Sequence, residues 1–437
     1  MSEVGVGAPA TTVQDMQDVQ DVQDVQDPTE GLFAWFRAML DTAPVYVDEQ
    51  QVWQVFDHAD VTRILSDPAT FSSDTSRFNP AQADLDLFTQ GNIVAMDPPR
   101  HRALRSLVSA VFTPRVVAGL APRIAEVTAS LLDAVEGQER FDLVDALAYP
   151  LPITVIAELL GVPSEDQPRF RSWAEVLFSQ QAPEATIFPS PEAMKELIEA
   201  VAPTLREMND YLLGHVRQRR TRPTDDLIGR LTAAEVDGQR LADEEIVGFA
   251  AVLLLAGHVT TTALLGNAVV TLDANPQAAA ELRADPGLLP AAIEEVLRVR
   301  TPFPRLGRVT TVDTQIGGRE VPAGHLVIPW VAAANRDPAR FPDPDRFDIH
   351  RNTTGHLAFG HGIHFCIGAP LARLEGKIAL GMLLERYPTL AVDHSAPIEF
   401  QNPYVMIAVK RLPVRTGPRL HDREGNLDPM AENPSRS

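Results

Sequence analysis

The stretch that decides the fold reads Phe359-Gly-His-Gly-Ile-His-Phe-Cys366-Ile-Gly-Ala-Pro370, and it contains the only cysteine of the 437-residue chain. A single cysteine cannot form an internal disulfide, and free cysteine is most often a small buried hydrophobe. The neighbours of Cys366 favour another interpretation, because three glycines let the backbone turn sharply or approach a flat group closely. Pro370 is typical of the first turn of a helix, where a thiolate is stabilised. The stretch therefore predicts a glycine-lined loop that presents one thiolate to an iron.

This loop resembles the haem-binding loop of the cytochrome P-450 superfamily. Phe359, Gly362, His364, Cys366 and Gly368 match the family's pattern at every fixed position. The resemblance implies that Cys366 is the axial thiolate ligand of haem b (iron protoporphyrin IX) and that the other residues of the loop surround the cofactor. It also implies a monooxygenase that uses dioxygen and external electrons to hydroxylate an unactivated C–H bond. A structural or nucleophilic cysteine is the alternative.

Composition places limits on the class of protein. The chain is 45% hydrophobic and 22% charged, which is ample for a large core, and its formal net charge is −21. Such a charge argues against binding to nucleic acid or to anionic membranes. One cysteine fits a reducing cytosol, residues 1–27 lack the features of a signal peptide, and the apolar run Phe249–Ala256 is too short to span a bilayer. We expect a soluble cytoplasmic monomer.

The two ends of the chain differ from its middle. Val-Gln-Asp copies recur from Val13 to Asp27, and a period of three matches neither helix nor strand. We expect residues 1–28 to form a disordered acidic tail, with a short partner-binding helix as the alternative. Residues 417–437 are polar and form a second tail, which leaves 29–416 as the haem domain.

The pattern between the tails is mainly helical. Residues 243–273 form one long helical pattern that is apolar almost all round, so it should run through the core. Strands are expected at 52–56, 311–316 and 327–330, and residues 72–95 form a long loop. Further helices are expected at 60–67, 99–112, 116–135, 142–160, 165–180 and 290–300. Together with the resemblance, this predicts a mainly α cytochrome P-450 fold: a helical bundle with a long central helix and a smaller β-rich lobe.

Glu295-Val-Leu-Arg298 places a carboxylate and a guanidinium on one face of a helix. By itself this is an ordinary surface ion pair of little energetic worth. In the family that the chain resembles, this Glu and Arg and a later Arg lock the scaffold behind the cysteine loop. The resemblance therefore implies that Glu295, Arg298 and Arg346 are structural.

Four basic residues lie in segments that the resemblance places near haem. His101 and Arg105 are four residues apart and share a helix face. Haem carries two propionates, which need charge-assisted partners when they are buried. The resemblance implies that His101, Arg105, Arg308 and His364 bind them; solvated surface residues are the alternative.

The long helix carries Ala256-Gly-His-Val-Thr260 at its centre. Ala256 and Gly257 lie one turn before Thr260, and small residues there leave room for a flat cofactor and dioxygen. The resemblance implies that Thr260 is the catalytic, oxygen-activating threonine; a threonine that bonds back to its own helical turn is the alternative. The family has an acid where this chain has Val259, so water or a substrate hydroxyl would carry protons. His258, a weaker candidate, is expected on another face.

The substrate is expected to be a macrolide or related polyketide of antibiotic biosynthesis, oxidised once or repeatedly. Residues 256–267, Arg298 and Pro302-Phe-Pro resemble actinomycete enzymes of the erythromycin and tylosin pathways. Terpenoids or fatty acids are alternatives, as is a non-catalytic helper subunit of a glycosyltransferase, although the helpers lack the cysteine. The expected substrate pocket contains Phe88, Val94, Leu253, Val259, Phe303, Leu306 and Val405.

Electrons must come from outside, since the sequence contains no flavin or iron–sulfur motif. The expected partners are a ferredoxin and its reductase, which draw on NAD(P)H. An acidic chain should repel an acidic ferredoxin, so docking requires a local basic patch. Arg100, Arg102, Arg115 and Arg373 are the candidates for it.

Overall fold

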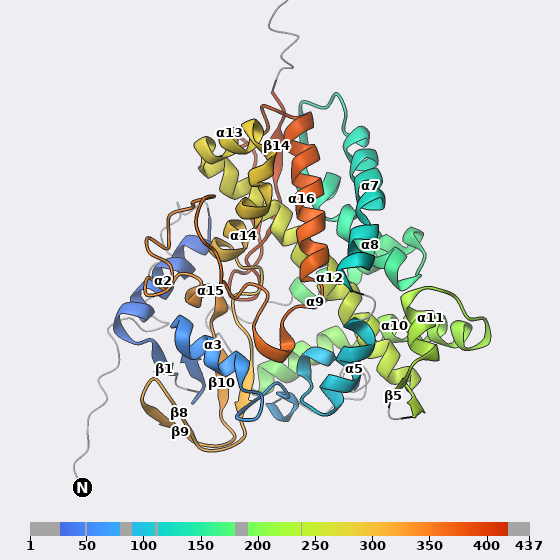
Figure 1. Ribbon diagram of the computed structural model, residues 1–437, viewed down its shortest axis with the longest axis vertical. Coiled ribbons are helices and arrows are strands. Elements are labelled where there is room, and N and C mark those ends of the chain that lie inside the picture. Colours follow the sequence, from blue (N-terminus) through green and yellow to red (C-terminus); the bar gives the residue numbers. More distant parts are fainter. Residues whose placement is uncertain are drawn as a thin grey trace, which may run out of the picture.

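The computed structural model describes residues 27–48, 50–78, 90–109, 112–179, 191–236 and 238–417 (Figure 1). Both predicted tails, apart from the residues 27–28 and 417, and the pocket candidate Phe88 lie outside these residues. Their predicted roles therefore stay predictions.

Helices make up most of the described chain, as predicted, and the long central helix runs behind the cysteine loop in Figure 1. The helices are α2 (Thr29–Thr42), α3 (His58–Ser66), α5 (Arg100–Ser109), α6 (Pro114–Gly119), α7 (Ala121–Ala134), α8 (Pro150–Leu160), α9 (Gln167–Ser179), α10 (Pro191–Thr221), α11 (Leu227–Ala233), α12 (Asp243–Ala274), α13 (Pro276–Ala284), α14 (Leu289–Val299), α15 (Val331–Ala334) and α16 (Ala369–Arg386). A π-helix lies at Val144–Ala148, and 3₁₀ turns lie at Ser76–Phe78, Ile93–Ala95, Ser164–Asp166, Pro286–Leu288 and Gly362–His364.

The predicted β-rich lobe is present, at the lower left of Figure 1. The strands are β1 (Val45–Val47), β2 (Trp53–Val55), β3 (Phe71–Ser72), β4 (Arg140–Asp142), β5 (Glu235–Val236), β6 (Gln239–Arg240), β7 (Arg308–Thr310), β8 (Thr314–Ile316), β9 (Arg319–Val321), β10 (Leu326–Pro329), β11 (Ala391–Val392), β12 (Glu399–Phe400), β13 (Val409–Arg411) and β14 (Pro413–Arg415). The largest sheet has the order β1-β2-β10-β7-β3, in which β10 runs parallel to β2 and the other pairs are antiparallel.

The lobe differs from the prediction in how it is assembled. We expected strands to cluster late in the chain, but the five-stranded sheet joins early strands to late ones, as in the pairing of Trp53 with Val327. Of the strand expected at 311–316, only Thr314–Ile316 forms a strand, because the chain bends at 311–312, after β7 ends at Thr310. The early segment closes on the late segment because their apolar faces share one core, formed by residues such as Val55 and Val327.

Helix α12 is the central element that was predicted. Its middle residues are buried on nearly all sides, and it packs against α8, α10 and α16. Of the described helices it is the one that is long and apolar enough by itself to cross a membrane, contrary to the estimate from the run Phe249–Ala256. However, 78% of its apolar window is buried inside the protein, which is the environment of a core helix.

Five described helices were absent from the prediction, namely α2, α10, α11, α13 and α15, and the two longest of them are α2 and α10. Helix α2 begins where the Asp27 carboxylate accepts hydrogen bonds from the backbone N–H and the hydroxyl of Thr29, at 2.9 and 2.6 Å. It then buries an apolar face that includes Trp35 and Phe36. Helix α10 runs for 31 residues through Pro203, which argues against a helix when the sequence is read alone.

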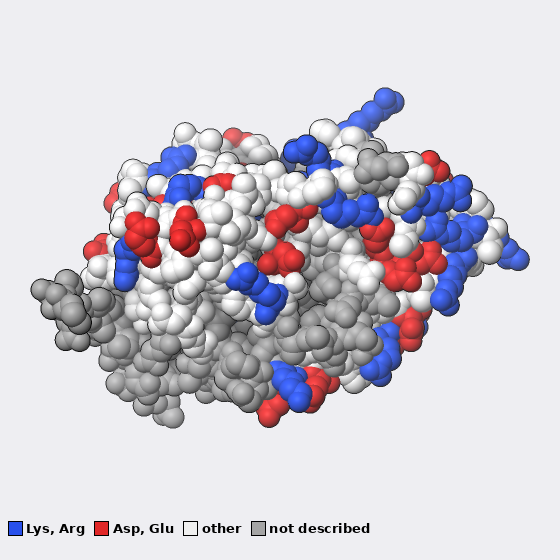
Figure 2. Space-filling view, turned by 90° about the horizontal axis from the view of Figure 1, so that it is seen from below, with Lys and Arg blue, Asp and Glu red and all other residues white. Residues whose placement is uncertain are grey.

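The surface carries both signs of charge. Figure 2 shows basic and acidic side chains interspersed on the face of the molecule seen from below Figure 1. Several of the arginines are held in ion pairs, such as Arg100 with Glu245 and Arg169 with Glu207. This face therefore carries no large patch of a single sign among its described residues.

Candidate active site

The loop that carries Cys366 is shaped by its glycines and joined to α16. The backbone N–H of Cys366 donates to the carbonyl oxygen of Phe359 at 2.8 Å, which closes the loop. Gly362 has φ +68°, and a Cβ there would lie 2.5 Å from the carbonyl oxygen of Leu65, so a side chain is excluded. Burial raises the pKa of the half-buried Cys366 thiol, while the N–H groups of Gly368 and Ala369 lower it. The loop thus holds the sulfur at the start of a helix, as predicted.

Four basic side chains gather beside this loop. The rings of His101 and His364 lie 4.2 Å apart, and the Nε2 atoms of both are buried with no hydrogen-bond partner among the described residues. Burial, together with the charges of His101, Arg308 and Arg105, lowers the pKa of His364 to about 3. Burial also lowers the pKa of Arg308 to about 10. Two orphaned imidazoles and two desolvated guanidinium groups fit the two carboxylates of haem.

The centre of α12 presents one open position. Ala256 is exposed although Leu254 and Leu255 beside it are buried. The hydroxyl of Thr260 donates to the carbonyl oxygen of Ala256 at 2.8 Å, so both lie along one side of the helix. This is the back-bond to the helical turn that the sequence left as the alternative.

Gly257 lies where α12 meets α8. A Cβ on Gly257 would lie 2.9 Å from a side-chain carbon of Ile156, which belongs to α8. The absence of a side chain therefore lets α8 pack closely on α12. That Gly257 also leaves room for the cofactor stays a prediction.

His258 points to a different face from Thr260, as expected. It is fully buried, its Nδ1 lies 2.6 Å from the carbonyl oxygen of Leu254, and its ring meets that of Tyr149 edge-on at 5.5 Å. Burial lowers its pKa to about 4, so the ring is neutral at physiological pH. A neutral imidazole on the α8 side is poorly placed to replace the missing acid.

One buried acid escaped the sequence analysis. Glu375 on α16 is 1% exposed and forms a hydrogen bond with the side chain of Thr261, the neighbour of Thr260. Burial raises the pKa of Glu375 to about 8, so it holds a proton at neutral pH. The signal in the sequence is its spacing, because Leu371 and Ala379, four residues to either side, are both buried.

The ionic lock behind the loop uses a different arginine from the one predicted. Arg298 donates from Nε and Nη2 to the two oxygens of Glu295, both at 2.7 Å, and both side chains are fully buried. The second arginine at Glu295 is Arg351, whose Nε lies 3.0 Å from Oε1. Arg346 contributes its carbonyl oxygen, which accepts from Arg298 and Arg351. The assignment of the Arg346 side chain to the lock is therefore corrected to Arg351.

The predicted pocket residues separate into groups. Val259 and Phe303 share an apolar cluster with Phe178, Ala263, Met406 and Ala408. Leu253 belongs to the main core and Leu306 packs against the core of the β-rich lobe. Val94 is 53% exposed and Val405 is half-buried. The apolar cluster that contains Val259 thus comes from α9, α12 and the segments around Phe303 and Met406.

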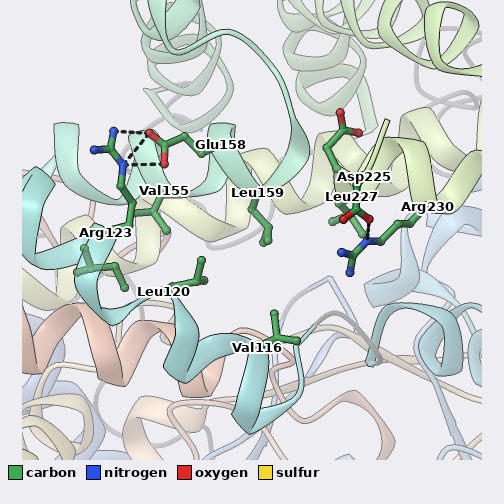
Figure 3. A pocket seen from close by; sticks show the side chains of 11 residues that line it. Val116, Leu120, Arg123, Val155, Glu158, Leu159, Asp225, Leu227 and Arg230 are labelled. Carbon is green, nitrogen blue, oxygen red and sulfur yellow. Dashed lines mark hydrogen bonds and ion pairs between the residues drawn. The ribbon is translucent and has the colours of Figure 1, made fainter. Parts of the chain in front are cut away.

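A groove of about 260 Å³ lies elsewhere, between α6, α7, α8 and α11 (Figure 3). Its floor is apolar, with Val116, Leu120 and Leu159, and ion pairs such as that of Arg123 with Glu158 lie at its edges. It contains none of the residues predicted for the active site.

A mainly helical fold with a glycine-lined cysteine loop, a buried basic cluster and a long core helix defines a class of haem-binding enzyme. The cytochrome P450 family profile matches residues 21–416, and the chain belongs to that family. It is a monooxygenase, an oxidoreductase, like the relatives described next.

Several relatives come from actinomycetes. The erythromycin C-12 hydroxylase of Saccharopolyspora erythraea is 46% identical over 88% of this chain and 94% of its own length. The cyclomarin C epoxidase CymV of Salinispora arenicola is 48% identical over 84% of this chain and 92% of its own. A mutant of P450 EryK in complex with erythromycin B has a TM-score of 0.83 at 44% identity, covering 90% of this chain and 98% of its own. These likenesses confirm the predicted fold.

Proposed function

We propose that this enzyme hydroxylates an unactivated C–H bond of a macrolide or related polyketide in antibiotic biosynthesis. The observation that carries the proposal is the 46% identity to the erythromycin C-12 hydroxylase over nearly the whole of both chains. The apolar cluster of Val259, Phe303 and Met406 supports it, because Val259 precedes Thr260 on α12 and a large, lightly oxygenated molecule requires apolar contacts. The similarity to CymV makes epoxidation the second reaction to be tested.

The cofactor in this proposal is haem b with Cys366 as its axial ligand. When bound, haem with a thiolate ligand activates dioxygen for insertion of one oxygen atom into the substrate. His101, Arg105, Arg308 and His364 would hold its propionates, supported by the orphaned Nε2 atoms of the two histidines. Phe359 and Gly368 would border it from the loop, and Ala256 from the central helix.

Protons would be delivered by residues on α12 and α16. Val259 has no proton to give, and His258 lies on another face. Thr260, whose hydroxyl donates to the Ala256 carbonyl, would orient a water or a substrate hydroxyl by accepting a hydrogen bond from it. Protonated Glu375, bonded to the adjacent Thr261, is the buried acid that could resupply such a chain.

Electrons would come from a ferredoxin and its NAD(P)H-dependent reductase in the cytoplasm, with the enzyme acting as a monomer. The absence of flavin and iron–sulfur motifs from the sequence supports an external source.

The test of the substrate class is a binding titration. A panel of macrolides, with a terpenoid and a fatty acid of similar size, is added to the purified enzyme while its resting haem spectrum is recorded. We expect at least one macrolide to shift the Soret band, and product analysis then distinguishes hydroxylation from epoxidation. A shift confined to the terpenoid or the fatty acid would refute the macrolide assignment.

A further inference from the structure

A second ionic cluster joins both sides of the Cys366 loop to α14. Arg373 donates from Nε to Oε1 of Glu294 at 2.7 Å and from Nη2 to Oε2 at 2.8 Å. The Nε2 of His356, which precedes the loop, lies 2.9 Å from Oε2 of the same carboxylate. The Nδ1 of His356 accepts from the backbone N–H of Ala358 at 3.3 Å, so Nε2 carries the proton that is donated to Glu294. We call Glu294, His356 and Arg373 the Glu294 network.

The network reaches the cysteine through Phe359. The guanidinium carbon of Arg373 lies 4.5 Å from the centroid of the Phe359 ring, and the carbonyl oxygen of Phe359 accepts from the N–H of Cys366. The charges of Arg373 and of an ionised Cys366 also favour each other. The Glu294 carboxylate therefore partly neutralises the positive charge of Arg373, which acts on the Cys366 sulfur.

Partial burial makes this charge effective. The side chains of His356, Glu294 and Arg373 are 7%, 24% and 37% exposed. Charges in such a setting are screened less by water and salt than surface pairs are. Hydrogen bonds from Arg373 and His356 outweigh burial and lower the pKa of Glu294 to about 2, so the carboxylate is ionised throughout the physiological range.

We propose that the Glu294 network tunes the reduction potential of the haem iron by offsetting the positive charge that Arg373 presents to the Cys366 thiolate. This inference rests on the proposed function, in which Cys366 is the ligand. Glu294 and Arg373 are then positioning residues, distinct from the fully buried lock of Glu295 on the same helix.

The proposal predicts shifts of opposite sign. Reduction adds a negative charge to the site, so an uncompensated cation nearby favours it and an uncompensated anion opposes it. Glu294→Gln keeps the shape but removes the negative charge, and the potential should rise. Arg373→Gln leaves the carboxylate with the neutral His356 but without its cation, and the potential should fall. We expect each variant to change the reduction equilibrium by about threefold to tenfold, where tenfold corresponds to about 59 mV for one electron.

The experiment is a spectroelectrochemical titration of the purified holoenzymes. Wild type and each variant are first reduced under carbon monoxide, and a thiolate-type Soret band shows that Cys366 is bound. Failure of that step in the wild type would contradict the proposed function, which separates it from a failure of the network. The double variant Glu294→Gln/Arg373→Gln should return close to the wild-type potential, because both charges are removed.

Matched controls isolate charge from structure. Arg123 and Glu158 form another two-point pair, with Nη2 2.7 Å from Oε1 and Nε 3.1 Å from Oε2, and Glu158→Gln should leave the potential unchanged. Arg373→Lys keeps the charge and should stay near wild type. If Glu294→Gln loses its haem, the difference in reduction potential between Arg373→Gln and Arg373→Lys is sufficient to test the proposal. Shifts of the same sign in both single variants, equal potentials for the two Arg373 variants, or no shift beyond that of Glu158→Gln would overturn the proposal.

Discussion

At the scale of single residues, the Thr260 hydroxyl is the group on α12 that we expect to position a water or a substrate hydroxyl for proton delivery. It donates to the carbonyl oxygen of Ala256 at 2.8 Å, and its oxygen lone pairs can still accept a hydrogen bond from a water or a substrate hydroxyl. His258, fixed to Leu254 and packed on Tyr149, lies on another face of the helix.

We therefore predict that Thr260→Ala uncouples the enzyme, because loss of a positioned acid–base group typically costs about 100-fold or more. Peroxide should be released in place of product, while Thr260→Ser should retain most of the coupling. The measurement is product formed per NAD(P)H consumed. Full coupling in Thr260→Ala would mean that Thr260 has only a packing role. Stronger uncoupling in His258→Ala than in Thr260→Ala would mean that His258 takes part in proton delivery.

The buried acid Glu375 gives a pH dependence of stability. Burial raises its pKa from 4.5 to about 8 in the folded protein, so the folded state retains a proton that the unfolded state has released between these values. The free energy of unfolding should therefore fall as the pH rises through this window, and Glu375 adds no pH dependence outside it.

Glu375→Gln should remove this slope. The melting temperature of the variant should exceed that of wild type by more at about pH 8.5 than at about pH 5. Glu158→Gln, on the surface, serves as the control. Parallel melting curves for wild type and Glu375→Gln across this range would show that the carboxyl is ionised in the folded protein.

At the scale of elements, the contact of α12 with α8 depends on Gly257. A Cβ at position 257 would lie 2.9 Å from a side-chain carbon of Ile156. Gly257→Ala should therefore lower the free energy of unfolding by about 1–3 kcal/mol through overpacking. Ile156→Val in the same chain should recover part of the loss, because it removes a methyl from the clash. Denaturant unfolding measures both, and an unchanged midpoint in Gly257→Ala would mean that α8 moves away freely.

Elements with a clear local sequence pattern could be predicted, and elements that depend on tertiary contacts could not. The apolar run of α12 and the glycine loop before Cys366 have strong local patterns. Helix α10 contains Pro203, and its continuity comes from packing on α12 and α9. The role of Gly257 depends on which helix faces it, and the choice of Arg351 over Arg346 depends on the path of the chain after Pro344, where local sequence offers no signal.

At the scale of the whole molecule, the predicted basic patch is smaller than the sequence suggested. Arg100 is paired with Glu245, and Arg373 with Glu294. Arg102 and Arg115 are exposed and have no ion-pair partner among the described residues.

Reversing the charge of an arginine that has no ion-pair partner among the described residues should therefore slow electron transfer from ferredoxin most. We predict that Arg102→Glu slows ferredoxin-dependent turnover more than Arg100→Glu, and that the wild-type rate falls with rising salt, because screening weakens steering. Stopped-flow reduction by ferredoxin measures the effect. Equal rates for wild type and Arg102→Glu would place the docking surface elsewhere.

The central claim, that Cys366 is the axial ligand of haem, is tested most directly by the reduced spectrum under carbon monoxide. Cys366 is the only cysteine, so no other residue of the chain can supply a thiolate. Fresh wild-type protein is predicted to show the Soret band of thiolate-ligated haem, and Cys366→Ser to lose both this band and hydroxylation. A band typical of histidine-ligated haem in unheated wild-type protein would contradict the account.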